Sequence, residues 1–184
     1  MRFLTLANQL TILRIMLVPA FVLLVVYGQL GAALVVFTVA GATDALDGFL
    51  ARHAGQRTAI GAWLDPMADK LLLLTTFVVL TVPSIPLTNH LPLWLTVILI
   101  SRDVVIVGVV AIVNLALGPR TFRPSMWGKL ATATFIVTSV VVMYFNYLEQ
   151  TSSLVDLFVW ISAGLTVVSA ADYFFKLRRL INEP

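Results

Sequence analysis

The sequence DALDGFLARHAGQRTAIGAWLDPMADK, residues 44–70, places four aspartates in a chain that is otherwise largely apolar. The spacing is D-x-x-D-G-x-x-A-R, eight residues, and then G-x-x-x-D-x-x-x-D, with fixed positions Asp44, Asp47, Gly48, Ala51, Arg52, Gly61, Asp65 and Asp69. If helix runs through Ala51 and resumes near Gly61, the aspartates of each pair lie three or four residues apart on one helical face. Each helix then presents two carboxylates.

The segment between these two helices, residues 52–60, is short and polar, which predicts an antiparallel helical hairpin. At about 1.5 Å per residue, Asp47 lies roughly 6 Å before the end of the first helix and Asp65 roughly 6 Å after the start of the second. The two aspartate pairs should therefore face each other at similar depth.

Four carboxylates that converge in a site of low dielectric constant need a compensating charge. One divalent cation, or two, would supply it, and oxygen ligation without Cys or His favours Mg²⁺ or Mn²⁺ over zinc. A hard ion of this kind usually works on phosphate. In the alternative interpretation Asp65 caps a helix and Asp44 and Asp47 are interfacial polar residues, which explains one aspartate but not the spacing of four.

At these residues the chain resembles the CDP-alcohol phosphatidyltransferase family, integral membrane enzymes of phospholipid synthesis. The resemblance implies two divalent metal ions held by Asp44, Asp47, Asp65 and Asp69, with Asp69 also acting as the general base. It further implies that the CDP part of the donor contacts the hairpin and the N-terminal stretch, at Gly48, Ala51, Arg52, Thr58, Gly61, Asn8 and Thr11.

The composition indicates a membrane protein, because 60% of the 184 residues are hydrophobic, only 11% are charged, and the mean hydropathy is +0.99. Six stretches approach the roughly 20 residues that a bilayer requires, namely 10–28, 31–51, 61–82, 92–117, 127–147 and 154–175. We therefore expect an all-α fold, a polytopic bundle of six transmembrane helices in a single domain over residues 1–184. The chain has no cysteine, which excludes disulfides and zinc–thiolate sites.

The positive charges predict the orientation of this bundle. The loops that follow the first, third and fifth stretches contain no Lys or Arg, whereas the opposite loops and both ends are basic. By the positive-inside rule the termini and the aspartate hairpin face the cytoplasm, and we expect a bacterial inner membrane. The net charge of +3 is thereby explained without a nucleic-acid partner.

Asn8, Thr11 and Arg14 are spaced three residues apart, which favours a short amphipathic interfacial helix at the N-terminus. The alternative is a polar helix start whose arginine reaches to the membrane surface.

Two charged residues, Arg102 and Asp103, lie about ten residues into the fourth stretch, where a charge is costly, so both should face the bundle interior. Adjacent residues on a helix point about 100° apart, so we expect them to pair with other groups more than with each other. A structural polar pair and a role in the substrate pocket both stay open. Asp172 and Lys176 should form an i, i+4 ion pair.

The segment GPRTFRPSMWGK, residues 118–129, carries Arg120, Arg123 and Lys129. Position alone favours an ordinary positive-inside loop. Similarity to family members with a basic loop and a G-K entering the fifth helix favours instead the binding of an anionic acceptor by these three residues. We add Arg102 as a fourth candidate residue for binding the acceptor.

The expected function is transfer of the phosphatidyl group from CDP-diacylglycerol to a glycerol-type acceptor, glycerol 3-phosphate, giving phosphatidylglycerophosphate and CMP. The runs ISRDV (100–104) and FRPS (122–125) look more like cardiolipin synthases of the family, so phosphatidylglycerol stays open as the acceptor. A homodimer also stays open. A cation transporter would place its carboxylates near the membrane centre, often in paired halves, and the sequence shows neither.

Overall fold

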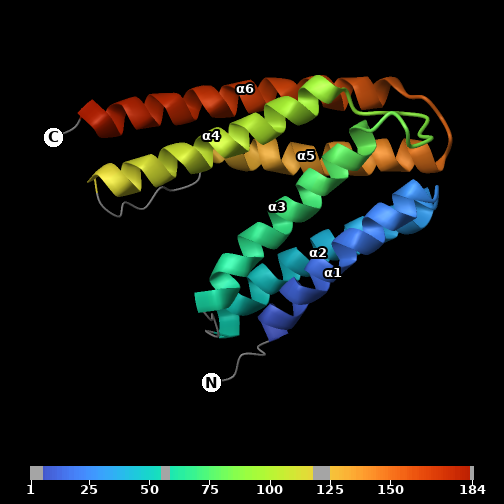
Figure 1. Cartoon of the computed structure of the whole chain (residues 1–184), viewed down its shortest axis with the longest axis horizontal. Helices are drawn as coiled ribbons and strands as arrows, with labels where there is room; N and C mark the ends of the chain where they lie inside the picture. The colour runs from blue at the N-terminus through green and yellow to red at the C-terminus, as the bar shows by residue number, and fades with distance from the viewer. Residues whose placement is uncertain (1–5, 55–58, 118–124, 183–184) are drawn as a thin grey trace. The chain divides into compact units, whose positions relative to one another are not determined.

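The computed structural model describes residues 6–54, 59–117 and 125–182, and the side chains of residues 9–43, 67–109, 111–112, 115 and 125–176. The described residues form six α-helices and no strand. The helices are α1 (Leu6–Val26), α2 (Leu30–Ala54), α3 (Ala59–Thr81), α4 (Leu93–Leu117), α5 (Met126–Tyr147) and α6 (Ser153–Asn182) (Figure 1). The predicted all-α class and the order of its helices are confirmed.

Three helices are long and apolar enough to cross a bilayer when the described residues are searched. Their apolar segments are Gln9–Val26, Met126–Tyr147 and Ser153–Lys176. Many large apolar side chains are also exposed, among them Met16, Leu115 and Trp160, as expected of a surface that contacts lipid. These features support a membrane protein, and six membrane spans stay a prediction.

The chain divides into two compact units. The first comprises Met1–His90 and Val142–Thr151, and the second Leu91–Val141 and Ser152–Pro184. Each unit is described by itself, and a single domain over residues 1–184 stays a prediction.

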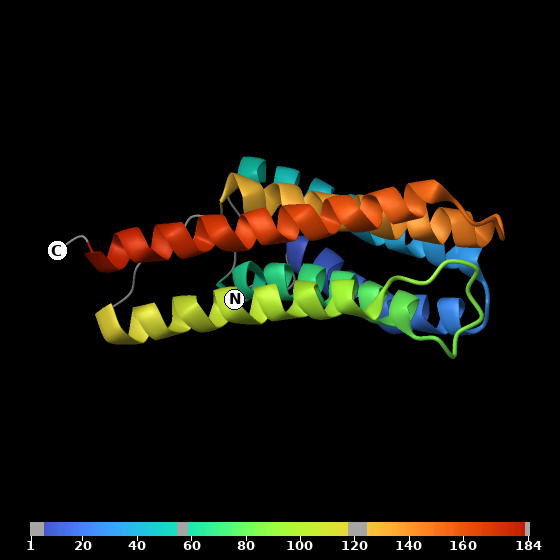
Figure 2. The ribbon, with the colours of Figure 1, turned by 90° about the horizontal axis from the view of Figure 1, so that it is seen from above.

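In the first unit, α1 packs against both α2 and α3, and α2 runs antiparallel to the other two (Figures 1 and 2). One stripe of α1 is buried, formed by Thr11, Arg14, Val18, Phe21 and Val25. These residues recur every three or four positions, as the core face of a packed helix does. The centroids of the Phe21 ring and of the Phe37 ring on α2 are 6.0 Å apart. Along α2, Phe37 comes between two small buried residues, Ala33 and Ala40.

The aspartate-bearing helices form the predicted hairpin, since α3 returns antiparallel to α2 (Figure 1). The prediction of a loop over residues 52–60 was wrong at both ends, because α2 continues to Ala54 and α3 begins at Ala59. Arginine and alanine are good helix formers, so Arg52 and Ala54 extend the helix although the segment looks polar.

No separate interfacial helix precedes α1 in the described part of the chain. Residues from Leu6 onward belong to one continuous helix that ends at Val26. There Gly28, at φ +73°, closes it with a Schellman motif, in which the Gly28 N–H donates to the Val25 carbonyl (3.0 Å) and the Gln29 N–H to the Leu24 carbonyl (2.8 Å).

A pair of asparagines ties the segment after α3 to the end of α5 within the first unit. The Asn89 N–H donates to Asn146 Oδ1 at 2.7 Å, and Asn146 Nδ2 donates to the Asn89 carbonyl at 2.9 Å. Asn89 Nδ2 also donates to the Gln150 carbonyl at 2.8 Å. Asn146 is fully buried, so its amide satisfies backbone groups that water cannot reach.

In the second unit, α6 runs alongside α4 in the same direction and α5 runs back (Figure 2). A stripe of small polar residues on α6, Ser162, Thr166 and Ser169, is buried. The Ser162 hydroxyl is hydrogen-bonded to that of Thr138 on α5 at 2.8 Å. Small hydroxyl residues let apolar helices approach closely and bond to one another.

Candidate active site

The hairpin of α2 and α3 carries all four signature aspartates on helical backbone. Asp44 and Asp47 belong to α2, and Asp65 and Asp69 to α3. With the observed helix bounds, Asp47 lies about 10 Å before the end of α2 and Asp65 about 9 Å after the start of α3, so the two remain at similar depth. The side chains of Asp44, Asp47 and Asp65 lie outside the described residues.

Asp69 is the one signature aspartate whose side chain is described, and Arg14 of α1 donates to it. Arg14 Nη1 lies 2.6 Å from Asp69 Oδ1, and the two side chains are 1% and 41% exposed. Arg14 Nε also donates to the Ala40 carbonyl on α2 at 3.3 Å. The guanidinium of Arg14 therefore connects α1 to both helices of the hairpin.

Both interpretations of the N-terminal stretch, the interfacial helix and the arginine that reaches to the membrane surface, were wrong about Arg14. Its side chain is neither on an interfacial face nor extended to the membrane surface, because it is buried in the stripe that α1 packs against α2 and α3. The sequence held a signal for this: Arg14 and Phe21 are seven residues apart, as are Thr11, Val18 and Val25. A seven-residue spacing places a residue on the packed face of a helix.

Six of the seven residues expected to contact CDP lie on three helices of the first unit. Gly48, Ala51 and Arg52 belong to the last turns of α2, and Gly61 to the first turn of α3. Asn8 and Thr11 belong to α1, and Thr11 is fully buried on the same stripe as Arg14. Thr58 lies outside the described residues.

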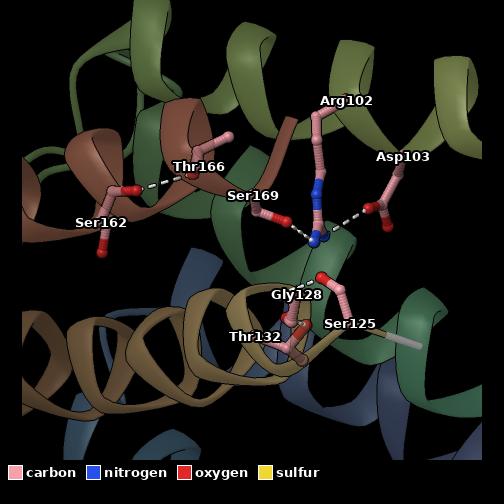
Figure 3. Close-up of polar contacts among 8 residues, drawn as sticks. All are labelled: Arg102, Asp103, Ser125, Gly128, Thr132, Ser162, Thr166 and Ser169. Atoms are coloured by element: carbon pink, nitrogen blue, oxygen red, sulfur yellow. Dashed lines mark hydrogen bonds and ion pairs between the residues drawn. The ribbon is translucent and has the colours of Figure 1, made fainter. Parts of the chain in front are cut away.

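Arg102 is held inside the second unit by groups of its own chain (Figure 3). Its Nη1 donates to Asp103 Oδ1 at 3.0 Å and its Nη2 to Ser169 Oγ on α6 at 2.7 Å, and the side chain is 9% exposed. The expectation that Arg102 and Asp103 would pair with other groups more than with each other was therefore wrong for this bond. The Cβ directions of neighbours diverge, but the long arginine side chain bends back to reach the carboxylate. Its Nε is buried and has no hydrogen-bond partner among the described residues.

Arg102 points toward the first turn of α5, where Ser125 caps the helix (Figure 3). The Gly128 N–H donates to Ser125 Oγ at 3.0 Å, the usual bond of an N-cap serine. A Cβ added at Gly128 would lie 3.2 Å from Arg102 Nη2 and 3.3 Å from Ser125 Oγ. A glycine at this position lets the guanidinium lie close to α5.

The expected acceptor residues are only partly described. Lys129 follows Gly128 in the first turn of α5 and is exposed, whereas Arg120 and Arg123 lie outside the described residues. The predicted ion pair of α6 is confirmed, with Lys176 Nζ 2.9 Å from Asp172 Oδ2.

The donor set of the hairpin fits a hard divalent cation. Its four candidate ligands are carboxylates, the oxygen ligands that Mg²⁺ and Mn²⁺ prefer. Where side chains are described, no three acidic or histidine residues gather into a metal-binding group, and of the four aspartates only Asp69 is among those residues.

Comparison with known proteins identifies relatives across nearly the whole chain. A probable phosphatidylglycerophosphate synthase of Mycobacterium tuberculosis is 34% identical over 97% of this chain and 84% of its own length. The CDP-diacylglycerol–glycerol-3-phosphate 3-phosphatidyltransferase of Bacillus subtilis is 30% identical over 93% of this chain and 94% of its own. The human cardiolipin synthase (CMP-forming) is 33% identical over 96% of this chain, which spans 63% of the human protein's length.

The sequence model of the CDP-alcohol phosphatidyltransferases matches residues 4–168. That match includes the hairpin with its four aspartates and continues through α4 and α5. The chain belongs to the CDP-alcohol phosphatidyltransferase family.

Proposed function

We propose that the protein transfers the phosphatidyl group of CDP-diacylglycerol to glycerol 3-phosphate, giving phosphatidylglycerophosphate and CMP. The observation that carries this proposal is the complete aspartate signature on the helical hairpin of α2 and α3, in a chain that belongs to the family. The relatives named as using glycerol 3-phosphate support the choice of acceptor.

The acidic residues have the central roles in the proposed reaction. Two Mg²⁺ or Mn²⁺ ions would be held by Asp44, Asp47, Asp65 and Asp69, and when bound they would neutralise the pyrophosphate of the donor. The acceptor hydroxyl attacks the β-phosphorus of CDP-diacylglycerol, Asp69 accepts the hydroxyl proton, and the bond to the leaving CMP breaks. Each transfer thus exchanges one P–O bond for another.

The donor is bound, in this proposal, by residues near the end of the hairpin at which α2 is connected to α3. Arg52 carries the positive charge of that group, and the glycines let the donor approach the helix backbone. The other members are Gly48, Ala51, Thr58, Gly61, Asn8 and Thr11. With six membrane spans and the Lys/Arg distribution of the loops, this end faces the cytoplasm of a bacterial cell.

The acceptor phosphate is bound by Arg120, Arg123 and Lys129. Charge-assisted hydrogen bonds to phosphate are the strong ones, and arginine can form two in parallel. Arg102 is included with these three as a candidate, and it lies beside Gly128, the residue before Lys129 (Figure 3). Its two terminal nitrogens bond to Asp103 and Ser169 within the protein.

A second acceptor is supported by the comparisons. The human cardiolipin synthase and that of Streptomyces coelicolor are 33% and 32% identical to this chain, close to the values for the glycerol 3-phosphate enzymes. Phosphatidylglycerol is therefore the alternative acceptor, which would give cardiolipin.

An acceptor assay on the purified protein separates the two. Labelled CDP-diacylglycerol is supplied with glycerol 3-phosphate or with phosphatidylglycerol, and CMP release is measured. A small dianion is held mainly through its phosphate, so Arg123→Ala should cost about 1.5–3 kcal/mol, or roughly 10- to 150-fold in use of glycerol 3-phosphate. Phosphatidylglycerol also binds through its acyl chains and should lose less.

The matched control is Arg179→Ala, which removes a cation from the C-terminal end and should leave acceptor use unchanged. Unchanged turnover of glycerol 3-phosphate in Arg123→Ala would contradict the acceptor-binding role of this loop. Consumption of phosphatidylglycerol alone would replace the proposed product with cardiolipin.

A further inference from the structure

Arg14 is the largest fully buried side chain of α1, and it carries a charge. A guanidinium removed from water is costly unless its N–H groups are bonded and its charge is compensated. Asp69 supplies a carboxylate at 2.6 Å, and Ala40 supplies a carbonyl at 3.3 Å. The sequence therefore keeps a buried charge on α1 that is directed at the helices of the aspartate hairpin.

The two bonds fix the guanidinium from different sides. Ala40 belongs to α2 and Asp69 to α3, and Arg14 reaches them through different nitrogens, Nε and Nη1. Arginine presents its donors in a rigid planar fork, so the bond from Nε determines the direction in which Nη1 points. A lysine has neither the fork nor the second anchor.

The Asp69 side chain is 41% exposed, so packing alone does not hold its carboxylate. The terminal torsion of an aspartate is broad, and the bond from Arg14 restricts it. We propose that Arg14 is a positioning residue for Asp69. From α1, it holds the Asp69 carboxylate in the orientation in which Asp69 can take the proton of the acceptor hydroxyl. This inference rests on the proposed role of Asp69 and adds a residue that acts through it.

The test compares Arg14→Gln and Arg14→Lys with Val25→Ala. Val25 is fully buried on the same stripe of α1, so its truncation loosens packing without removing the bond to Asp69. For each purified variant we would measure kcat, the KM for CDP-diacylglycerol, and Mn²⁺ binding without substrate by electron paramagnetic resonance.

A misplaced catalytic group can cost on the order of 100-fold in rate, and we expect that loss of kcat in Arg14→Gln, with the donor KM changed by less than about threefold. Arg14→Lys keeps the positive charge and should recover part of the lost kcat. It also provides the test of the proposal if Arg14→Gln does not fold. Both variants should still bind Mn²⁺, because the carboxylates are intact.

A kcat for both Arg14 variants within about threefold of Val25→Ala would overturn the positioning role. An increased donor KM at unchanged kcat would also overturn it, since Arg14 would then bind the donor. Asp69→Asn separates this inference from the proposed function. If that variant is active, the role of Asp69 itself fails; if it is inactive while Arg14→Gln keeps the wild-type kcat, only the role of Arg14 fails.

Discussion

Two arginines, the buried Arg14 in the first unit and the largely buried Arg102 in the second, each bond to an aspartate and to a second acceptor. Arg14 bonds to Asp69 and to the Ala40 carbonyl, and Arg102 bonds to Asp103 and to the Ser169 hydroxyl. Removing one partner of a buried ion pair costs about 3–5 kcal/mol, and the exposure of Asp69 reduces that figure for its pair. Such ion pairs are costly to displace, so the residues packed next to them must leave room for their side chains.

Gly128 shows this adaptation, and Gly128→Ala should destabilise the protein. The added Cβ would lie 3.2 Å from Arg102 Nη2, and two bonds prevent the guanidinium from moving away freely. Overpacking of this kind costs about 1–3 kcal/mol, against a gain of about 0.5–1 kcal/mol from placing alanine in a helix. Thermal unfolding in detergent would measure the net loss.

Gly164→Ala is the matched control, because a Cβ at Gly164 meets nothing within 4 Å among the described residues. It lies in α6 of the same unit, and the substitution should leave the midpoint unchanged or raise it. Equal shifts for the two variants would mean that Arg102 does not require a glycine at position 128.

At the scale of the elements, the apolar stretches predicted the helices well because long runs of apolar residues have few alternatives in a membrane protein. The predicted ends of the helices were wrong where the polarity of the sequence and its helix propensity disagree. Arg52 and His53 look like a loop but are helical, and the stretch predicted to end at residue 175 continues as helix to Asn182. Polarity marks where a chain leaves the apolar layer, which is not always where its helix ends.

The connection after α3 depends on Asn146, and Asn146→Leu should destabilise it. The substitution conserves approximate volume but leaves the buried Asn89 N–H and carbonyl without their partners. An unsatisfied buried polar group costs about 1–3 kcal/mol, so the two together should lower the free energy of unfolding by at least about 2 kcal/mol. The measurement is denaturant or thermal unfolding in detergent.

Gln150→Ala is the control for this prediction. Asn89 bonds to the backbone carbonyl of Gln150, which the substitution keeps, and the Gln150 side chain is exposed. A surface change should stay within about 0.5 kcal/mol. If Asn146→Leu is equally mild, the asparagine pair does not hold this connection.

At the scale of the whole molecule, the sequence predicted the helical class and the hairpin from hydropathy and spacing. It did not predict the bonds from Arg14 to Asp69 and from Arg102 to Asp103, because the conformation of a long side chain is not encoded in the spacing of its neighbours. The seven-residue spacing of Arg14 and Phe21 on α1 was a signal for a packed face that the predicted interfacial helix did not use. The aspartate signature predicts ligands for metal, and the side chains of three of those aspartates lie outside the described residues.

The proposed orientation predicts which loops a membrane-impermeant thiol reagent can reach. The chain has no cysteine, so a single introduced one reports without background. Gln56→Cys, between α2 and α3, should be labelled only from the cytoplasmic side, and Thr88→Cys, exposed in the connection after α3, only from the other. Labelling from the reverse sides would mean that the protein is inserted the other way round.

Binding of divalent cations by the four aspartates of the hairpin, and their need in transfer from CDP-diacylglycerol, can be measured as CMP release with and without metal. Purified protein is given CDP-diacylglycerol and acceptor in EDTA and then in excess Mg²⁺ or Mn²⁺, alongside Asp44→Ala, Asp47→Ala and Asp65→Ala. We expect no CMP in EDTA, full recovery with metal, and no release by any of the three variants although each inserts in the membrane. Full CMP release in EDTA, or wild-type release by any of these variants, would mean that the aspartates do not hold a metal ion that the reaction needs.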